Sequence, residues 1–146
     1  MKPVEYDHPQ LGFTISFPPG SEVEEDVPGT AVVAYDAGVE DGFRTNLVIT
    51  VDDGADDVEA FTDAGLQALP SALRAFQLLD RTSTTLGGAA ATRTLAHHDA
   101  DGWAVTLEQW RVVDGGRGYT ITGSAATLDY DAVADALAEA AESFRP

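Results

Sequence analysis

Cysteine is absent from this sequence, and lysine is nearly absent. The 146 residues include no Cys, which excludes disulfides, thiolate nucleophiles and cysteine-based zinc sites. Lys2 is the only lysine, and 8 Lys and Arg residues stand against 25 Asp and Glu, giving a formal net charge of −17. A surface of this sign repels nucleic-acid phosphates and anionic lipid headgroups. We therefore expect no nucleic-acid partner.

Long apolar runs are also missing. No stretch approaches the roughly twenty apolar residues that a spanning helix requires, so we expect no membrane insertion. The segment Met1–Asp7 lacks the basic region and following apolar stretch of a secretory signal. The sequence thus predicts a cytoplasmic protein.

The length and composition are those of one globular domain. The hydrophobic content of 44% suffices for a core. No internal repeat, low-complexity segment or long linker interrupts the chain. We expect a single domain over residues 1–146.

Alternating side chains predict strands in the first third of the chain. Phe13, Ile15 and Phe17 alternate with Thr14 and Ser16, the period-two pattern of a half-buried strand. The prolines at 18 and 19 end it, and Gly20 permits a turn. Strands are expected over 12–17, 31–35 and 45–51, with an acidic, solvated connector over 22–26.

Two segments have helical spacing instead. Apolar residues recur every three or four positions from Val58 to Leu73, preceded by four aspartates that can cap the helix within 52–57. Pro70 should end or kink this helix near Leu69. The second helix is expected over 129–144. Its apolar stripe comprises Tyr130, Val133, Leu137, Ala141 and Phe144.

Between the helices the sequence predicts a strand over 76–84, then a meander with turns at 99–102 and 114–117. The strands of the meander are expected over 89–98, 103–113 and 118–125. In the middle strand the apolar positions change parity between Leu107 and Trp110, which predicts a bulge near Glu108 and Gln109.

This order of elements predicts an α+β fold: a single antiparallel β-sheet of about five to seven strands, packed by two main α-helices. The side chains expected in the core are Phe13, Ile15, Phe17, Leu47, Ile49, Phe61, Leu107, Tyr119, Ile121, Val133, Leu137 and Phe144.

Five segments carry a family resemblance through their order and spacing. They are 12–18 (GFTISFP), 43–49 (FRTNLVI), 85–93 (TLGGAAATR), 118–122 (GYTIT) and 143–145 (SFR). With them the chain resembles a PsbP-like domain, in particular the LpqN-type branch common in actinobacterial proteins. The resemblance implies a non-enzymatic scaffold whose relatives act as protein-binding accessories, assembly factors or chaperones. It supplies no catalytic residue.

Two clusters contain metal-ligand side chains. His97, His98, Asp99 and Asp101 lie within five positions, but neighbouring residues of a strand point to opposite faces. A hairpin turn with capping aspartates explains the same residues. The acidic segment 52–57 lacks the ligand alternation of a calcium loop, and helix capping explains it more simply. We expect neither a metal nor a cofactor.

No catalytic constellation is visible. The serines at 71 and 124 lack the flanking glycines of a nucleophile elbow, and residues 115–118 lie between strands without a helix N-terminus to hold a phosphate. Glu108 is either a buried acid or, as we favour, a solvent-facing residue beside the bulge. For Trp103 and Trp110 we favour core packing over a pocket or interface.

These observations predict a non-enzymatic accessory or adaptor protein that binds another protein of unknown identity. The alternative is a small-molecule or lipid carrier that uses a cleft between the sheet and the C-terminal helix, and a hydrolase is a weaker third reading. The aromatic residues proposed for protein contact are Tyr35, Phe43 and Trp103. A second copy of the chain is a further candidate partner.

Overall fold

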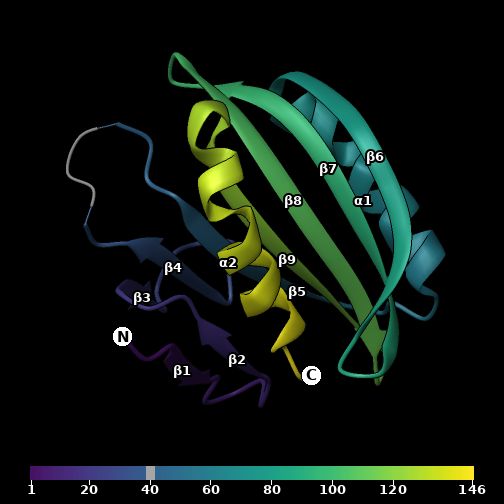
Figure 1. Cartoon of the computed structure of the whole chain (residues 1–146). Coiled ribbons are helices and arrows are strands. Elements are labelled where there is room, and N and C mark those ends of the chain that lie inside the picture. The colour runs from purple at the N-terminus through teal and green to yellow at the C-terminus, as the bar shows by residue number, and fades with distance from the viewer. Residues whose placement is uncertain (39–41) are drawn as a thin grey trace.

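Seven antiparallel strands form the main sheet of the computed structural model, which describes residues 1–38 and 42–146 (Figure 1). In chain order they are β3 (Ser21–Glu24), β4 (Val32–Asp36), β5 (Asn46–Asp53), β6 (Arg74–Leu86), β7 (Ala89–Ala100), β8 (Trp103–Asp114) and β9 (Arg117–Ala126). Across the sheet the order is β3-β4-β5-β9-β8-β7-β6. The four long strands β6 to β9 thus include the meander predicted from the sequence.

The first two strands lie outside this sheet. β1 (Val4–Asp7) pairs with β2 (Thr14–Phe17) in a separate two-stranded antiparallel sheet. The expectation of a single sheet is therefore wrong in this detail. Periodicity identified β2 as a strand, but pairing is decided by distant contacts. The apolar face of β2 packs onto the main sheet instead of extending it.

Two helices lie on opposite faces of the main sheet (Figure 1). α1 (Val58–Ala72) contacts β6, β7 and β8, whereas α2 (Tyr130–Glu142), which follows the short 3₁₀ turn η1 (Thr127–Asp129), contacts β9 and β2. The α+β class is confirmed. Within the described residues neither helix has the length and apolar character needed to cross a bilayer.

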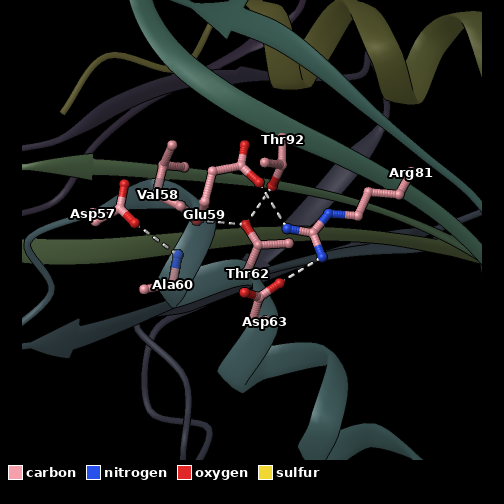
Figure 2. Close-up of polar contacts among 8 residues, drawn as sticks. All are labelled: Asp57, Val58, Glu59, Ala60, Thr62, Asp63, Arg81 and Thr92. Carbon is pink, nitrogen blue, oxygen red and sulfur yellow. Dashed lines mark hydrogen bonds and ion pairs between the residues drawn. The ribbon is translucent and has the colours of Figure 1, made fainter.

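Proline does not end α1 where the sequence suggested. Pro70 lies inside the helix, which continues to Ala72. The amide of Leu73 still donates to the carbonyl of Leu69 at 2.8 Å, so the hydrogen bond missing at Pro70 does not prevent the last turn from closing. Asp57 caps the other end, its carboxylate accepting from the Ala60 amide at 3.1 Å (Figure 2).

The apolar core fills the α2 face of the sheet, meaning the side that carries Leu47, Ile121 and Trp110. An aromatic cluster lies at its centre: Phe144, just past α2, has its ring centroid 5.5 Å from that of Phe13 and 5.3 Å from that of Tyr119. Of the predicted core residues, all but two are buried; Phe61 and Val133 are half-buried.

No bulge occurs at Glu108 and Gln109. The pairing of β8 with both β7 and β9 runs without a register shift past these residues, and the irregularities lie in the β6–β7 pairing instead. Every residue from Val105 to Val112 is buried. A strand that is covered on both faces has no need to alternate, so the change in apolar parity does not indicate a bulge.

The acidic connector was also misread. Residues Ser21–Glu24 form the edge strand β3, in which Glu22 and Val23 pair with Tyr35 and Ala34 of β4. Acidic side chains reduce β-propensity, but an edge strand exposes them to water and gains its hydrogen bonds from one neighbour.

The aromatic cluster gives a stability prediction. We expect Phe144→Ala to lower the free energy of unfolding by about 3–5 kcal/mol, because it removes a fully buried ring and leaves a cavity. Urea denaturation measures this change. The matched control is Leu128→Ala, at a side chain that is 98% exposed, for which we expect a change within about 0.5 kcal/mol. A loss below about 1 kcal/mol for Phe144→Ala would show that the last turn is frayed.

Candidate functional site

A cleft opens between α2 and the strands β4 and β5. Its volume is about 230 Å³, and the lining residues from the helix are Val133, Ala136 and Leu137. Ala34 and Leu47 line it from the sheet, and Pro18 lies at its rim. The walls are mostly apolar. This is the location that the sequence suggested for a ligand cleft.

Residue size explains why the cleft forms there. Over β9 the helix lies close to the sheet: a Cβ atom added at Gly123 would lie 3.3 Å from the Leu137 side chain. Over β4 the facing residues are Ala34 and Ala136, which are too small to fill the space between helix and sheet. The cleft is therefore the gap left where small side chains face each other.

The turn after β2 fixes the outer wall. Gly20 has a φ of +82°, which a residue with a side chain rarely adopts. The Ser21 hydroxyl donates to the Pro18 carbonyl at 2.7 Å, and the Ser21 amide donates to the same oxygen at 3.2 Å. Two consecutive prolines and these bonds make the rim rigid.

Tyr35 lies at the rim of the cleft, half-buried and tied to charged neighbours. Its hydroxyl donates to Glu24 at 2.7 Å, and the Arg44 guanidinium lies 5.3 Å from the ring centroid. Hydrogen bonds with Glu24 and then Glu22 raise the pKa of Tyr35 to about 12. The phenol therefore stays protonated at neutral pH.

The other two proposed contact residues lie apart from the cleft lining. Trp103, at the start of β8, is 45% exposed, and a Cβ at Gly42 would lie 3.2 Å from its indole ring. Phe43, next to Gly42, is half-buried. Trp103 is thus a surface residue beside the β4–β5 connection, in contrast to Trp110, which is in the core. Core packing was the wrong expectation for Trp103.

The two histidines are on opposite faces of β7, as the strand geometry requires. His97 pairs with Thr106 and His98 with Val105 of β8. Within residues 1–38 and 42–146, no three His, Cys, Asp or Glu side chains are arranged to hold a metal ion. In the 52–57 segment, Asp57 caps α1 and Asp53 lies 3.9 Å from Arg117.

Glu108 is buried, which corrects the expectation that it faces solvent. It points to the α2 face and receives hydrogen bonds from the Arg93 guanidinium and from the Tyr130 hydroxyl, the latter at 2.8 Å. Asp80 of β6 lies 3.7 Å from Arg93. Burial, the largest single effect, lowers the pKa of Arg93, but the hydrogen bond and charge of Glu108 together with Tyr130 outweigh burial and raise it. Sequence reasoning missed this group because its members come from three strands and a helix.

The Glu108 group fixes the start of α2. Tyr130 is the first residue of α2, and its hydroxyl reaches the central strand β8. Both hydrogen bonds to Glu108 are charge-assisted, the kind that stabilises most. We assign the group a structural role: it positions the helix that forms one wall of the cleft.

Comparison with known proteins identifies the fold. No protein-family model matches the sequence, and no curated protein sequence matches it either. Solved structures do match. The cyanobacterial PsbP protein CyanoP from Synechocystis sp. PCC 6803 has a TM-score of 0.73 at 17% identity, with 99% of this chain and 92% of that chain covered.

Two further structures give the same picture. LpqN from Mycobacterium tuberculosis, described as involved in cell envelope biogenesis, has a TM-score of 0.74 at 18% identity. The match covers 98% of this chain and 90% of the LpqN chain. A Pseudomonas aeruginosa protein of unknown function, PA94, described as a putative regulator, has a TM-score of 0.69 at 14% identity. The match covers 100% of this chain and 98% of that chain. The PsbP-like fold is confirmed; the LpqN-type branch stays a prediction.

Tyr130 gives a prediction for alkaline stability. Burial, and then its hydrogen bond to Glu108, raise the pKa of Tyr130 to about 12, whereas an unfolded tyrosine ionises near pH 10. Its contribution to stability is therefore complete below about pH 10 and is lost as the pH rises toward about 12. We expect Tyr130→Phe to cost about 1 kcal/mol at pH 8 and to make the alkaline loss of stability less steep. Urea titrations from pH 8 to pH 11 measure both. Parallel curves for the two proteins would contradict the assignment.

Proposed function

We propose that the protein is a non-enzymatic accessory protein that binds another protein, and that the cleft between α2 and β4–β5 receives an apolar group of that partner. The observation that carries this proposal is the apolar wall formed by Ala34, Leu47, Val133 and Leu137. Apolar pockets of this kind hold the anchor residues that dominate protein–protein affinity.

The buried acid of the α2 face supports a binding role over a catalytic one. Glu108 is held by Arg93 and Tyr130, and it is not among the residues that line the cleft. A general acid or base needs a titratable group within hydrogen-bond reach of the substrate. The PsbP-like fold is in keeping with a binding role, and the LpqN-type resemblance implies one.

A second candidate is a carrier of a small apolar molecule or lipid, because the cleft lies where a carrier would bind its cargo. The volume of the cleft favours the first candidate. Ligand sites usually measure about 300–1,000 Å³, whereas this cleft measures about 230 Å³. That space suits one or two apolar side chains better than a whole lipid chain. We therefore favour a protein partner.

The rim suggests which partners are selected. Glu22, Glu24 and Asp36 lie beside the cleft or on the strands that border it, in a chain of net charge −17. A segment with an apolar anchor and flanking basic residues would match this surface. Opposite charge steers encounter more than it adds affinity.

Filling the cleft tests the proposal. Ala136 lines the cleft on an exposed turn of α2, so Ala136→Trp should occupy the space without disturbing the core. The partner is first identified by co-purification and mass spectrometry. We expect the Ala136→Trp variant to bind it at least roughly tenfold more weakly than the wild-type protein does. The control is Ala68→Trp, at an exposed position of α1 on the opposite face. Equal loss with both variants, or none with Ala136→Trp, would contradict the use of the cleft.

A salt series separates the apolar and electrostatic contributions. We expect Trp103→Ala to slow or weaken association with the same partner, because exposed aromatic residues are frequent hot spots. Neutralising Glu24, Glu25 and Asp26 to their amides should lower only the association rate, and only at low salt. Stopped-flow rates between low and high ionic strength measure this. Binding that survives Trp103→Ala but disappears in the neutralised variant would show that acidity drives recognition.

A further inference from the structure

The sheet face beneath α1 is mixed, unlike the face beneath α2: Val105 and Leu107 are buried there beside a group of buried polar residues. Thr62 is the single fully buried side chain of α1. The strand residues on this face form cross-strand pairs, Thr92 with Arg111, Thr94 with Gln109, and Arg111 with Thr120. All of them are buried. Helices ordinarily cover apolar sheet faces, so this interface calls for an explanation.

Unpartnered polar atoms concentrate on the same face. Among the described residues, the buried side-chain atoms without a hydrogen-bond partner are Thr94 Oγ1, His98 Nδ1, Gln109 Oε1 and Arg111 Nη1. Register places all four side chains on the α1 side of β7 and β8. Buried polar groups are normally satisfied, and the described residues supply no partner for these four exceptions on one face.

Arg111 is the charged centre of this group. Its side chain is 3% exposed, and a Cβ at Gly65 of α1 would lie 2.7 Å from its Nε and Nη2 atoms. No carboxylate of the described residues lies within ion-pair distance of it. Burial, and then the charge of Arg81, lower the pKa of Arg111 to about 10, and the opposing charge of Asp52, beyond ion-pair distance, does not offset them. A buried guanidinium without an anion is unfavourable, and a bound anion would relieve it.

Polar contacts hold α1 on the sheet beside apolar ones from Phe61, whose ring lies over Gly118 of β9. The hydroxyls of Thr62 and Thr92 lie 2.6 Å apart, and Arg81 of β6 reaches Glu59 at 2.9 Å and Asp63 at 2.7 Å, as Figure 2 shows. The two ion pairs are partly exposed to solvent, where such pairs contribute little. Among the described residues, no residue of α1 belongs to the apolar core on the other face, so α1 can separate from the sheet without disrupting that core.

We propose that Arg111, Thr94 and Gln109 form a binding site for a small oxyanion that also carries an O–H group, and that α1 is the lid that closes over it. The guanidinium and the Thr94 hydroxyl donate to the anionic oxygens. Gln109 Nε2 is already bonded to Thr122 at 3.0 Å, which leaves its Oε1 to accept from the ligand's O–H. Hydrogen phosphate and small hydroxycarboxylates have this chemistry. The site is on the opposite face of the sheet from the cleft and does not depend on the proposed function.

A reversible lock on α1 provides the first test. The chain has no cysteine, and the Thr62 and Thr92 hydroxyls already face each other, so Thr62→Cys/Thr92→Cys should form a single disulfide that holds the lid shut. We expect calorimetric titration with inorganic phosphate or lactate to show saturable binding to the reduced variant and at least a tenfold weaker apparent affinity or slower binding after oxidation. Phosphate and lactate, titrated separately, show which anion is preferred. Identical binding by the oxidised and reduced forms would overturn the lid.

A charge-removing variant tests the site itself. Arg111→Met should abolish binding of both anions, whereas Arg44→Gln, at an exposed arginine near Tyr35, should leave it unchanged. Binding that survives Arg111→Met, or no saturable binding of either anion to the wild-type protein, would overturn the proposal. If Arg111→Met does not fold, the comparison of the oxidised and reduced disulfide variant still tests whether an anion binds beneath α1.

Hydrogen exchange supplies an independent measurement of the lid. We expect amides of α1 to exchange at least tenfold faster than those of α2 in the wild-type protein, and phosphate to slow them selectively. Equal protection of the two helices would overturn the proposal that α1 opens.

Discussion

The docking of the C-terminal segment onto β2 is the contact on which the α2 face depends. The Phe144 ring packs against Phe13 and Tyr119, and Thr14 and Arg145 exchange two backbone hydrogen bonds of 2.9 Å. This seam joins the N-terminal hairpin, the sheet and the last helix through residues more than a hundred positions apart. Because these contacts fix α2 at its end and the Glu108 group fixes it at its start, the helix is held at both ends. The cleft between α2 and β4 exists because the helix is fixed in this way.

The two faces of the sheet are built on different physical principles. Beneath α2, Leu137, Ala140 and Ala141 are buried among aliphatic and aromatic side chains, and burial of apolar area provides the stability. Beneath α1, buried hydroxyl, amide and guanidinium groups lie beside Val105 and Leu107, and several of these polar groups are unpartnered. An apolar interface resists opening, whereas a polar one loses less when water enters. This difference is the basis of the proposal that α1, and not α2, opens.

The few cations of this acidic chain have specific structural places. Arg81 links β6 to α1, Arg93 neutralises the buried Glu108, and Arg111 lies beneath Gly65. The surface is consequently left with most of the excess negative charge, which favours solubility and repels anions at a distance. An anion that reaches Arg111 must therefore be held by local contacts, not attracted by the protein as a whole. Binding at the cleft and binding beneath α1 would thus select for different chemistry.

By itself, the sequence determined the elements whose pattern is local: strand β2 from its alternation, α2 from its stripe, and the buried Phe144. Where a residue's surroundings come from distant segments, only the tertiary structure decided whether that residue is buried and what it contacts. The β8 strand is covered on both faces, so apolar and polar side chains do not alternate along it. The change in apolar parity therefore predicted a bulge where none exists. Burial of Glu108 and Arg111 depends on partners from other strands and helices. Local periodicity records which side of one element is covered, but not what covers it. That is why the fold was predictable in outline while both candidate sites emerged only when the helices were placed on the sheet.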